Sequence, residues 1–567
     1  MDKKMLYAIV AVVVVVIIVG AVAAVYLLAP PPGPAKYQLE LWYNNDGHYG
    51  DTEDELATVL KNSIEACGKV QVTLRSDTWA VYRQNWVAGT MPVFLLGWYP
   101  DYFDSDDYIS PFLSTSGATS LGSFYSNATM DTWITEEQST TDPAIRDGLF
   151  SSIQAKLAED VPYLPLFSGT AEVAYVTGIQ NVELHPVTFK WFIMDKPAAN
   201  ALTASTTDDV TSFDPASAYD YFSIEVINQV FDTLLVYEPV DATLMPGLAT
   251  AIPTVGNGGV TNNGLTYTYH LRPNIKFHDG TAFNASVMKR SIDRAIRLDI
   301  GGSAAFLLYD VGALGRNATY GNNTSPGVIE VVDDLTIRFN LARPVSFFND
   351  LMAFSVAAPV PWAYNPNGEQ PSVAGQVIGT GPYNLTAYTP DQLVVLTKFA
   401  TYHNPGLYSS FGIPAIPVED TVTINLRGSA AALKTDIETQ AVDVVYRTLT
   451  PTDLADLQAR AGTLGITVDV GQSPQIRYLV FNTETITDAR VRQAIAYSVD
   501  RAQIDSVVFN GLVTPLYSMI PSNMPYHEPI FQTEYGDADC TSANALFAQL
   551  GFVVGLFEPR EFVARDH

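Results

Sequence analysis

Four aspartates lie close together in one short loop and form the densest group of side chains that could perform chemistry. They are Asp101, Asp104, Asp106 and Asp107. Clustered carboxylates can bind calcium, and two carboxylates at the right separation can cleave a glycosidic bond. The loop lacks the alternating ligands and the glycine of an EF-hand, and no second acidic cluster can be paired with it. A solvated loop that caps the following helix, near residues 108–112, is the simpler interpretation.

The residues before this loop favour a third role, the binding of a cationic group. The apolar run Val93-Phe94-Leu95-Leu96 predicts a buried strand that leads into Gly97-Trp98-Tyr99-Pro100-Asp101-Tyr102. A carboxylate beside aromatic rings at the end of a strand is a good seat for a cation. Asp101, Trp98, Tyr99 and Tyr102 are therefore the candidate ligand-binding residues, with ordinary core packing as the alternative for the aromatic ones.

Motifs of other chemistries are absent from the sequence. It contains no H-E-x-x-H, G-x-S-x-G or G-x-x-x-x-G-K-[S/T], and Cys67 and Cys540 form no C-x-x-C pair. His270 and His278 do not have the spacing of metal ligands on a helix. We therefore expect a protein that is not an enzyme, with no catalytic residue, no metal site and no cofactor. The net charge of −29 disfavours nucleic acid as a partner.

The elements that position these residues are strands and helices in alternation. A chain of 567 residues is too long for one compact core, so we expect two or three lobes. The mixture of both patterns predicts the α/β class. Strand patterns occur at 38–43, 70–74, 265–269, 335–339 and 477–481, and helix patterns at 54–66, 144–157, 286–296, 429–439, 488–499 and 542–550.

The N-terminal segment, residues 1–36, has the pattern of a membrane anchor. Lys3 and Lys4 precede an apolar run from Met5 to Ala29, and a proline-rich spacer follows. That run is long enough to cross a bilayer and longer than the apolar part of a secretory signal, so a retained single-pass anchor is predicted. The positive-inside rule places the bulk of the chain outside the cytoplasm. Exposure there makes glycosylation plausible at the sequons that start at Asn127, Asn284, Asn317, Asn322, Asn323 and Asn384.

Four motifs together resemble the extracellular solute-binding proteins of family 5, which include oligopeptide, dipeptide, nickel and some oligosaccharide binders. Leu271-Arg272-Pro273, with Phe277 and Asp279-Gly280 after it, is similar to the family's LR-x-x-x-x-F-x-D-G signature. The segment 379–383 resembles its GTGPY turn, and 488–495 resembles its D-x-R-V-R-Q-A-I helix. Residues 97–102 resemble its GW-x-x-DY ligand segment.

The resemblance implies a two-lobed fold like that of type II periplasmic binding proteins, with an extra subdomain. It implies that the chain captures an oligopeptide or another small solute between the lobes and delivers it to the permease subunits of an ABC importer. Asp101 would be the carboxylate that pairs with the ammonium group of a peptide. An oligosaccharide binder, a surface receptor or coat protein that kept the fold, and a secreted hydrolase that uses the acidic loop are the alternatives.

The order of the motifs departs from the family, because the GW-x-x-DY segment comes first in this chain and late in the family. This order predicts a circular permutation whose new ends lie near Tyr37 and Leu550. The implied parts are the anchor and spacer 1–36, lobe II at 37–165 and 448–552, lobe I at 166–447 with its extra subdomain at about 250–375, and an unassigned tail at 553–567. A permuted chain would place Cys67 and Cys540 in one lobe, where a disulfide could join the new ends.

Overall fold

The computed structural model describes residues 36–197, 199–315 and 328–550. The predicted anchor between Met5 and Ala29 lies outside these residues. Within the described ranges, no helix combines the length and the apolar character that a membrane span requires.

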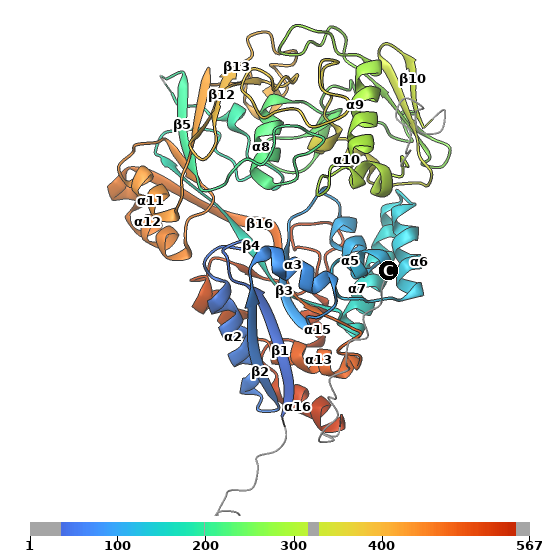
Figure 1. Ribbon diagram of the computed structural model, residues 1–567, viewed down its shortest axis with the longest axis vertical. Helices are drawn as coiled ribbons and strands as arrows, with labels where there is room; N and C mark the ends of the chain where they lie inside the picture. Colours follow the sequence, from blue (N-terminus) through green and yellow to red (C-terminus); the bar gives the residue numbers. More distant parts are fainter. Residues whose placement is uncertain (1–35, 198, 316–327, 551–567) are drawn as a thin grey trace, which may run out of the picture.

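One large sheet runs through the whole molecule and confirms the predicted α/β class (Figure 1). The strand order is β12 (Tyr383–Thr389), β13 (Leu393–Lys398), β14 (Thr421–Leu426), β5 (Ala201–Thr206), β15 (Val444–Tyr446), β4 (Tyr163–Val176), β16 (Ile466–Phe481), β3 (Val93–Trp98), β1 (Tyr37–Asn44) and β2 (Val70–Asp77), with β17 (Thr514–Pro515) beside β4. The sheet is mixed, with an antiparallel centre, a parallel run on either side of it and an antiparallel edge at β12–β14, and helices pack on it.

The lower lobe in Figure 1 has a single apolar core that two distant parts of the chain build together. The parts are 39–167 and 476–547, and their buried strands and helices are rich in Leu, Ile, Val and Phe. The longer helices of this lobe are α2 (Glu53–Ala66), α3 (Trp79–Val87), α6 (Ala128–Gln138), α7 (Pro143–Asp160), α13 (Ala489–Ser498) and α16 (Cys540–Gln549).

The upper lobe contains two cores, both formed almost wholly by residues between Val173 and Tyr446. One core lies around α8 (Tyr221–Val230) and the other around α9 (Ala285–Leu298). The second core also supports a separate sheet in the order β10 (Ile329–Asp333), β11 (Thr336–Asn340), β9 (Thr266–His270) and β8 (Val260–Thr261). The helices α11 (Ala430–Glu438) and α12 (Pro451–Leu464) pack on the large sheet in a fourth, smaller core. The chain is thus two-lobed, while the predicted limits of each domain stay a prediction.

The long strands β4 and β16 connect the two lobes. They pair with each other along most of their length, and the pairing shifts between Gln472 and Ile476, opposite Ser168 and Thr170. A break in the ladder of this kind lets a sheet bend or twist locally while each side keeps its own hydrogen bonds. The ribbon of β4 and β16, called the hinge strands below, therefore connects the lobes at a point where the sheet can bend.

The two ends of the described chain lie side by side in the lower lobe, as the predicted permutation requires. β1 pairs with β3, which pairs with the end of β16, so Leu41 and Phe481 belong to one sheet. The ring centroids of Tyr37 and Phe547 are 6.3 Å apart. Cys67 and Cys540 form a disulfide with their Cα atoms 4.9 Å apart. The predicted shared lobe is confirmed, whereas the circular permutation itself stays a prediction.

Three of the six sequon asparagines lie in the described residues. Asn127 and Asn284 cap the N-termini of α6 and α9, where their side-chain oxygens accept backbone N–H bonds. The amide of Asn384 donates to the carbonyl of Thr397. Asn317, Asn322 and Asn323 lie outside the described residues, and glycosylation stays a prediction.

Candidate functional site

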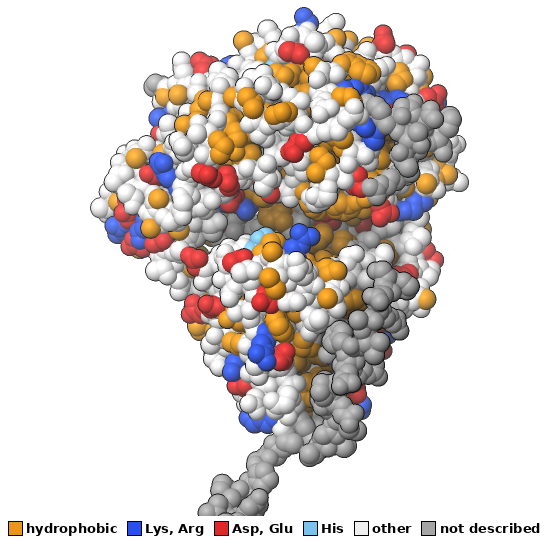
Figure 2. All heavy atoms as spheres, in the orientation of Figure 1, with side chains coloured by type: hydrophobic (Ala, Val, Ile, Leu, Met, Phe, Trp, Pro, Cys, Tyr) orange, Lys and Arg blue, Asp and Glu red, His pale blue; other side chains and the backbone are white. Residues whose placement is uncertain are grey.

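A cavity of about 110 Å³ lies between the lobes, next to the hinge strands. Figure 2 shows the hollow that separates the two lobes on one face of the molecule. The cavity receives side chains from the lower lobe, from the upper lobe and from the hinge strands, so a solute bound in it would touch all three. Its lining comprises Tyr99, Thr170, Ala171, Glu172, Leu184, His185, Pro186, Phe189, Tyr221, Tyr446, Arg447, Thr448, Gln472, Ser473, Pro474 and Gln475.

Aromatic rings form the walls of this inter-lobe cavity. Tyr99 follows β3 in the lower lobe, Tyr221 begins α8 in the upper lobe, and their ring centroids are 4.9 Å apart. On the upper side the ring of Phe189 stacks on that of Tyr446 with centroids 4.6 Å apart. Such walls can contact apolar, aromatic or sugar groups, and they can also face a cation.

Two charged side chains lie on the same cavity. Arg447 directly follows β15, and its Nε lies 2.9 Å from Oδ2 of Asp208. Glu172 lies on β4 and accepts the backbone N–H of Leu449 at 3.3 Å. Burial raises the pKa of Glu172 to about 7, and the nearby charge of Arg447 offsets only part of that effect.

A third acidic side chain, Glu225, lies behind the cavity wall on α8. It accepts hydrogen bonds from Nε1 of Trp191, at 2.7 Å, and from the hydroxyl of Tyr446. Burial outweighs these two donors and raises the pKa of Glu225 to about 8. A buried carboxyl group with a raised pKa therefore accepts a hydrogen bond from Tyr446 in the upper wall of the cavity.

The structure places Asp101 at the seam between the lobes but not on the inter-lobe cavity. Both of its carboxylate oxygens accept the hydroxyl of Tyr219 from the upper lobe, at 2.7 and 2.8 Å. Asp101 is 7% exposed, and burial raises its pKa to about 7 in spite of those bonds. The ionised form is thus disfavoured, and a cation beside the carboxylate would stabilise it.

The other predicted ligand-binding residues have different surroundings. Trp98 donates from Nε1 to Oδ2 of Asp107 at 3.2 Å, which holds the indole within the lower lobe. The ring of Tyr102 stacks on Phe347 of the upper lobe with centroids 4.6 Å apart, so Tyr102 is an inter-lobe packing residue. Of the four, only Tyr99 lines the inter-lobe cavity.

The acidic loop is a buried polar network and not the solvated loop that the sequence suggested. Asp106 and Asp107 are 0% and 1% exposed. Asp106 accepts from the hydroxyl of Tyr102 at 2.5 Å, and Asp104 accepts from both terminal nitrogens of Arg146. No group of His, Cys, Asp and Glu side chains in the described part of the chain is arranged to hold a metal ion.

Sequence reasoning missed Glu172, Arg447 and Tyr221. None of them lies in a charged cluster or a known motif, which is why pattern searches pass over them. Glu172 and Arg447 do share one signal, their position in the chain. Both lie near the predicted limits of the lobes, at 165/166 and 447/448, where the chain would cross from one lobe to the other. Residues at such crossings necessarily border the cleft.

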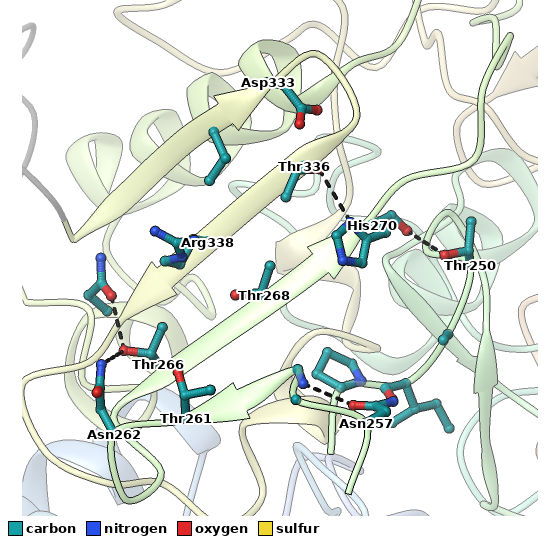
Figure 3. A pocket seen from close by; sticks show the side chains of 17 residues that line it. Thr250, Asn257, Thr261, Asn262, Thr266, Thr268, His270, Asp333, Thr336 and Arg338 are labelled. Atoms are coloured by element: carbon teal, nitrogen blue, oxygen red, sulfur yellow. Dashed lines mark hydrogen bonds between the residues drawn. The ribbon is translucent and has the colours of Figure 1, made fainter. Parts of the chain in front are cut away.

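A larger hollow, of about 650 Å³, lies on the separate sheet of the upper lobe (Figure 3). Threonines of β8, β9 and β11 point into it together with His270 and Arg338, and Asn257 bounds it from a loop. All of its lining residues come from one lobe. Lobe closure therefore cannot enclose a solute there, and we take the smaller inter-lobe cavity as the candidate site.

Comparisons with known proteins give a consistent set of relatives. The family model described as bacterial extracellular solute-binding proteins, family 5, matches residues 243–558. The glutathione-binding protein GsiB of Pectobacterium atrosepticum is 28% identical over 363 residues, which cover 63% of this chain and 62% of the relative. GsiB of Escherichia coli strain K12 is also 28% identical, with 63% of each chain covered. The matches thus span less than two thirds of the length of these relatives.

Two solved structures of binding proteins are similar to part of the chain. The binding protein AgaA from A. tumefaciens R10, in complex with agropinic acid, has a TM-score of 0.45 at 23% identity and covers 62% of this chain and 64% of its own. The murein tripeptide binding protein MppA of Escherichia coli has a TM-score of 0.43 at 19% identity, with 62% and 67% covered.

Proposed function

Because the chain belongs to the bacterial extracellular solute-binding proteins of family 5, we propose that it captures a small solute between its two lobes and delivers it to the permease of an ABC importer. The observation that carries this proposal is the inter-lobe cavity, whose lining combines Tyr99 of the lower lobe, Tyr221 of the upper lobe and the hinge strands. A solute in that position contacts both lobes at once, so its binding energy favours the closed arrangement over the open one.

The solute that fits best is a short peptide or a peptide-like molecule. Both GsiB relatives are named for glutathione, and one structural neighbour is named for a murein tripeptide. Ionisable groups at the cavity and the seam, Glu172, Arg447 and Asp101, suit a solute that carries charges of both signs. The aromatic walls would equally suit a sugar, which keeps an oligosaccharide as the second candidate.

Asp101 is the proposed partner of a cationic group of the solute. Its carboxylate is buried at the seam, where an ion pair is screened little by water. The solute has to displace the hydroxyl of Tyr219, which holds both carboxylate oxygens in the structure. Trp98 then supports the loop from behind through Asp107, and Tyr99 contacts the solute directly.

The residues before Lys36 are proposed to fasten this binding protein to the outer face of the cell membrane. The apolar run from Met5 to Ala29 supports the proposal by its length and by the two lysines before it. A surface receptor or coat protein with the same fold would share this attachment, but it would not need a cavity that closes around a solute. We also infer that the chain order is a circular permutation, supported by the motif order and by the adjacent ends.

Mass spectrometry of solutes that copurify with the full chain tests the proposed function. We expect a peptide or another small amine-bearing solute, and we expect that adding it back raises the unfolding temperature of stripped protein. If neither copurified material nor any member of a peptide and oligosaccharide panel raises the unfolding temperature, solute capture is wrong. A sugar as the copurified solute would establish the second candidate.

A further inference from the structure

We propose that Glu172 and Arg447 form a seat for the α-amino-acid head group of the captured solute, an ammonium and a carboxylate carried by one carbon atom. This inference rests on the proposed function and deepens it by naming the chemical class of solute. Asp101 lies outside the cavity that holds this seat and stays available for a second cationic group of the same solute.

The sheet places the two residues opposite each other. Tyr446, the last residue of β15, pairs with Val173 of β4 in an antiparallel ladder, so the next facing positions belong to Arg447 and Glu172. Facing side chains on neighbouring strands lie within reach of one small group. Glu172 on β4 and Arg447 at the end of β15 both line the inter-lobe cavity.

Arg447 is held in one orientation while part of its guanidinium stays available. Its Nε forms the ion pair with Asp208, and the guanidinium carbon lies 3.8 Å from the ring centroid of Tyr221. Neither of its terminal nitrogens donates a hydrogen bond to any residue that the structure describes, and the side chain is 31% exposed. A fixed guanidinium with two free terminal nitrogens is the geometry that binds a carboxylate through two parallel hydrogen bonds.

Glu172 has the complementary property of a carboxylate oxygen that has no donor and faces the cavity. The residue is 7% exposed, and its Oε1 accepts the N–H of Leu449. Oε2 accepts no hydrogen bond from the described residues, and Glu172 forms no ion pair within them. A buried carboxylate in this condition is costly, as its pKa of about 7 reflects. An ammonium group bound in the cavity beside Glu172 would donate the hydrogen bond that Oε2 lacks.

The two charged groups form no ion pair with each other, because Arg447 pairs with Asp208. A solute with a single carboxylate would be attracted by Arg447 but repelled by Glu172. A solute with a single ammonium group would be attracted by Glu172 but repelled by Arg447. A zwitterionic head group satisfies both residues at once, which neither simple ion can do. The volume agrees with this choice, because about 110 Å³ is well below the 300 Å³ or more of pockets that enclose a whole drug-sized ligand.

Two isomeric peptides test the seat. In γ-Glu-Ala-Gly the glutamate keeps its ammonium and carboxylate on one carbon, whereas in α-Glu-Ala-Gly that carboxylate is consumed by the peptide bond and the side chain carries the free one. The peptides have the same composition and charge. We expect calorimetry on the full-length protein to give at least roughly tenfold tighter binding of the γ isomer. We expect Arg447→Gln and Glu172→Gln each to remove this preference.

Two control variants distinguish the loss of this binding seat from the loss of the folded structure. Arg460→Gln removes another arginine, one that pairs with Glu438 away from the cavity, and should keep the preference. Arg447→Lys keeps the charge but lacks the forked donor pair, so it should fold with an unchanged unfolding temperature and still lose most of the preference.

Equal binding of the two isomers, binding of neither, or an unchanged preference in Arg447→Gln would overturn the inference. If a copurified solute still binds in any of these cases, the proposed function survives and only the seat is wrong. If no solute binds at all, both fail.

Discussion

At the residue scale, the carboxylate of Asp101 is held by Tyr219 across the seam, so a solute cation has to compete with that hydroxyl. We expect the unchanged protein to prefer a lysine-containing peptide over the same peptide with norleucine in place of lysine. Asp101→Asn should weaken binding of the lysine peptide roughly tenfold or more and leave the norleucine peptide unaffected. Titration calorimetry with both peptides measures this, and equal affinities in the unchanged protein would exclude Asp101 as a cation partner.

Tyr219→Phe is the matched variant for the same contact. It removes the competing hydroxyl and leaves the ring and the Asp101 carboxylate in place. The lysine peptide should then bind at least as tightly as it does to the unchanged protein. Weaker binding would mean that Tyr219 contacts the solute itself.

The buried carboxyl groups predict how stability depends on pH. The pKa of Glu225 is raised to about 8 by burial, from an ordinary value near 4.5. The folded protein therefore binds more protons than the unfolded chain between these two values, and its free energy of unfolding falls as the pH rises through that range. Urea unfolding should give a lower stability at pH 8 than at pH 5.5.

Glu225→Gln isolates this contribution. The amide keeps the shape and accepts the Trp191 N–H without a charge, so the variant should lose part of the decline between pH 5.5 and pH 8. The same decline in both proteins would show that other groups cause it, with Asp101 and Glu172 as the next variants to measure, since burial raises their pKa values to about 7.

At the element scale, the turn at 379–383 supports the helix that carries Tyr221. A Cβ atom on Gly379 would lie 2.0 Å from the carbonyl oxygen of Val230, the last residue of α8. Gly379→Ala should therefore destabilise the protein by about 2 kcal/mol, the usual cost of overpacking, and should displace α8. Gly406 has open space around its Cα, so Gly406→Ala is the control and should be close to neutral. Thermal unfolding compares the two, and equal midpoints would contradict the packing argument.

Regular elements with a strong apolar period were predictable to within a few residues. The strand expected at 70–74 is β2 (Val70–Asp77), and the helix expected at 286–296 is α9 (Ala285–Leu298). In contrast, β16 was expected only at 477–481, because Gly471 and Pro474 interrupt the strand pattern of its half-buried first part. Its length depends on pairing with β4, which no local pattern contains.

The candidate site was less predictable than the elements, and for the same reason. Tyr99 lines the cavity, and a strand end beside Gly-Trp is a local signal for such a position, while its contact with a solute stays a prediction. Glu172 and Arg447 line one cavity because β4 and β15, which are far apart in the sequence, pair with each other. Tyr102 looked like a ligand contact, yet its ring packs on Phe347 of the other lobe, a partner that only the tertiary structure supplies.

At the scale of the whole molecule, the disulfide between Cys67 and Cys540 encloses almost the entire described chain. A crosslink across so long a loop mainly restricts the unfolded state, so Cys67→Ser with Cys540→Ser should lower the free energy of unfolding by about 2–4 kcal/mol. Guanidinium unfolding of the oxidised protein and of the double variant measures the difference. Equal stability, together with free thiols in freshly isolated protein, would show that the bond does not form.

The predicted anchor is tested at the same scale. The mature chain should keep the run from Met5 to Ala29 and should stay with the membrane fraction after a high-salt wash. N-terminal sequencing of that fraction determines the outcome. A mature chain that starts between Ala29 and Lys36 would replace the anchor with a cleaved export signal.

The position of β1 also determines how mechanical load would enter the molecule. The described chain begins beside β1, at the end of the lower lobe farthest from the seam (Figure 1). β1 pairs in parallel with β2 from Tyr37↔Val70 to Asn44↔Asp77. A pull on the chain upstream of Tyr37 acts along the strand, so it loads all of these hydrogen bonds in shear at once and does not peel them apart one by one. The upper lobe lies outside this load path, since β1, β2 and β3 belong to the lower lobe.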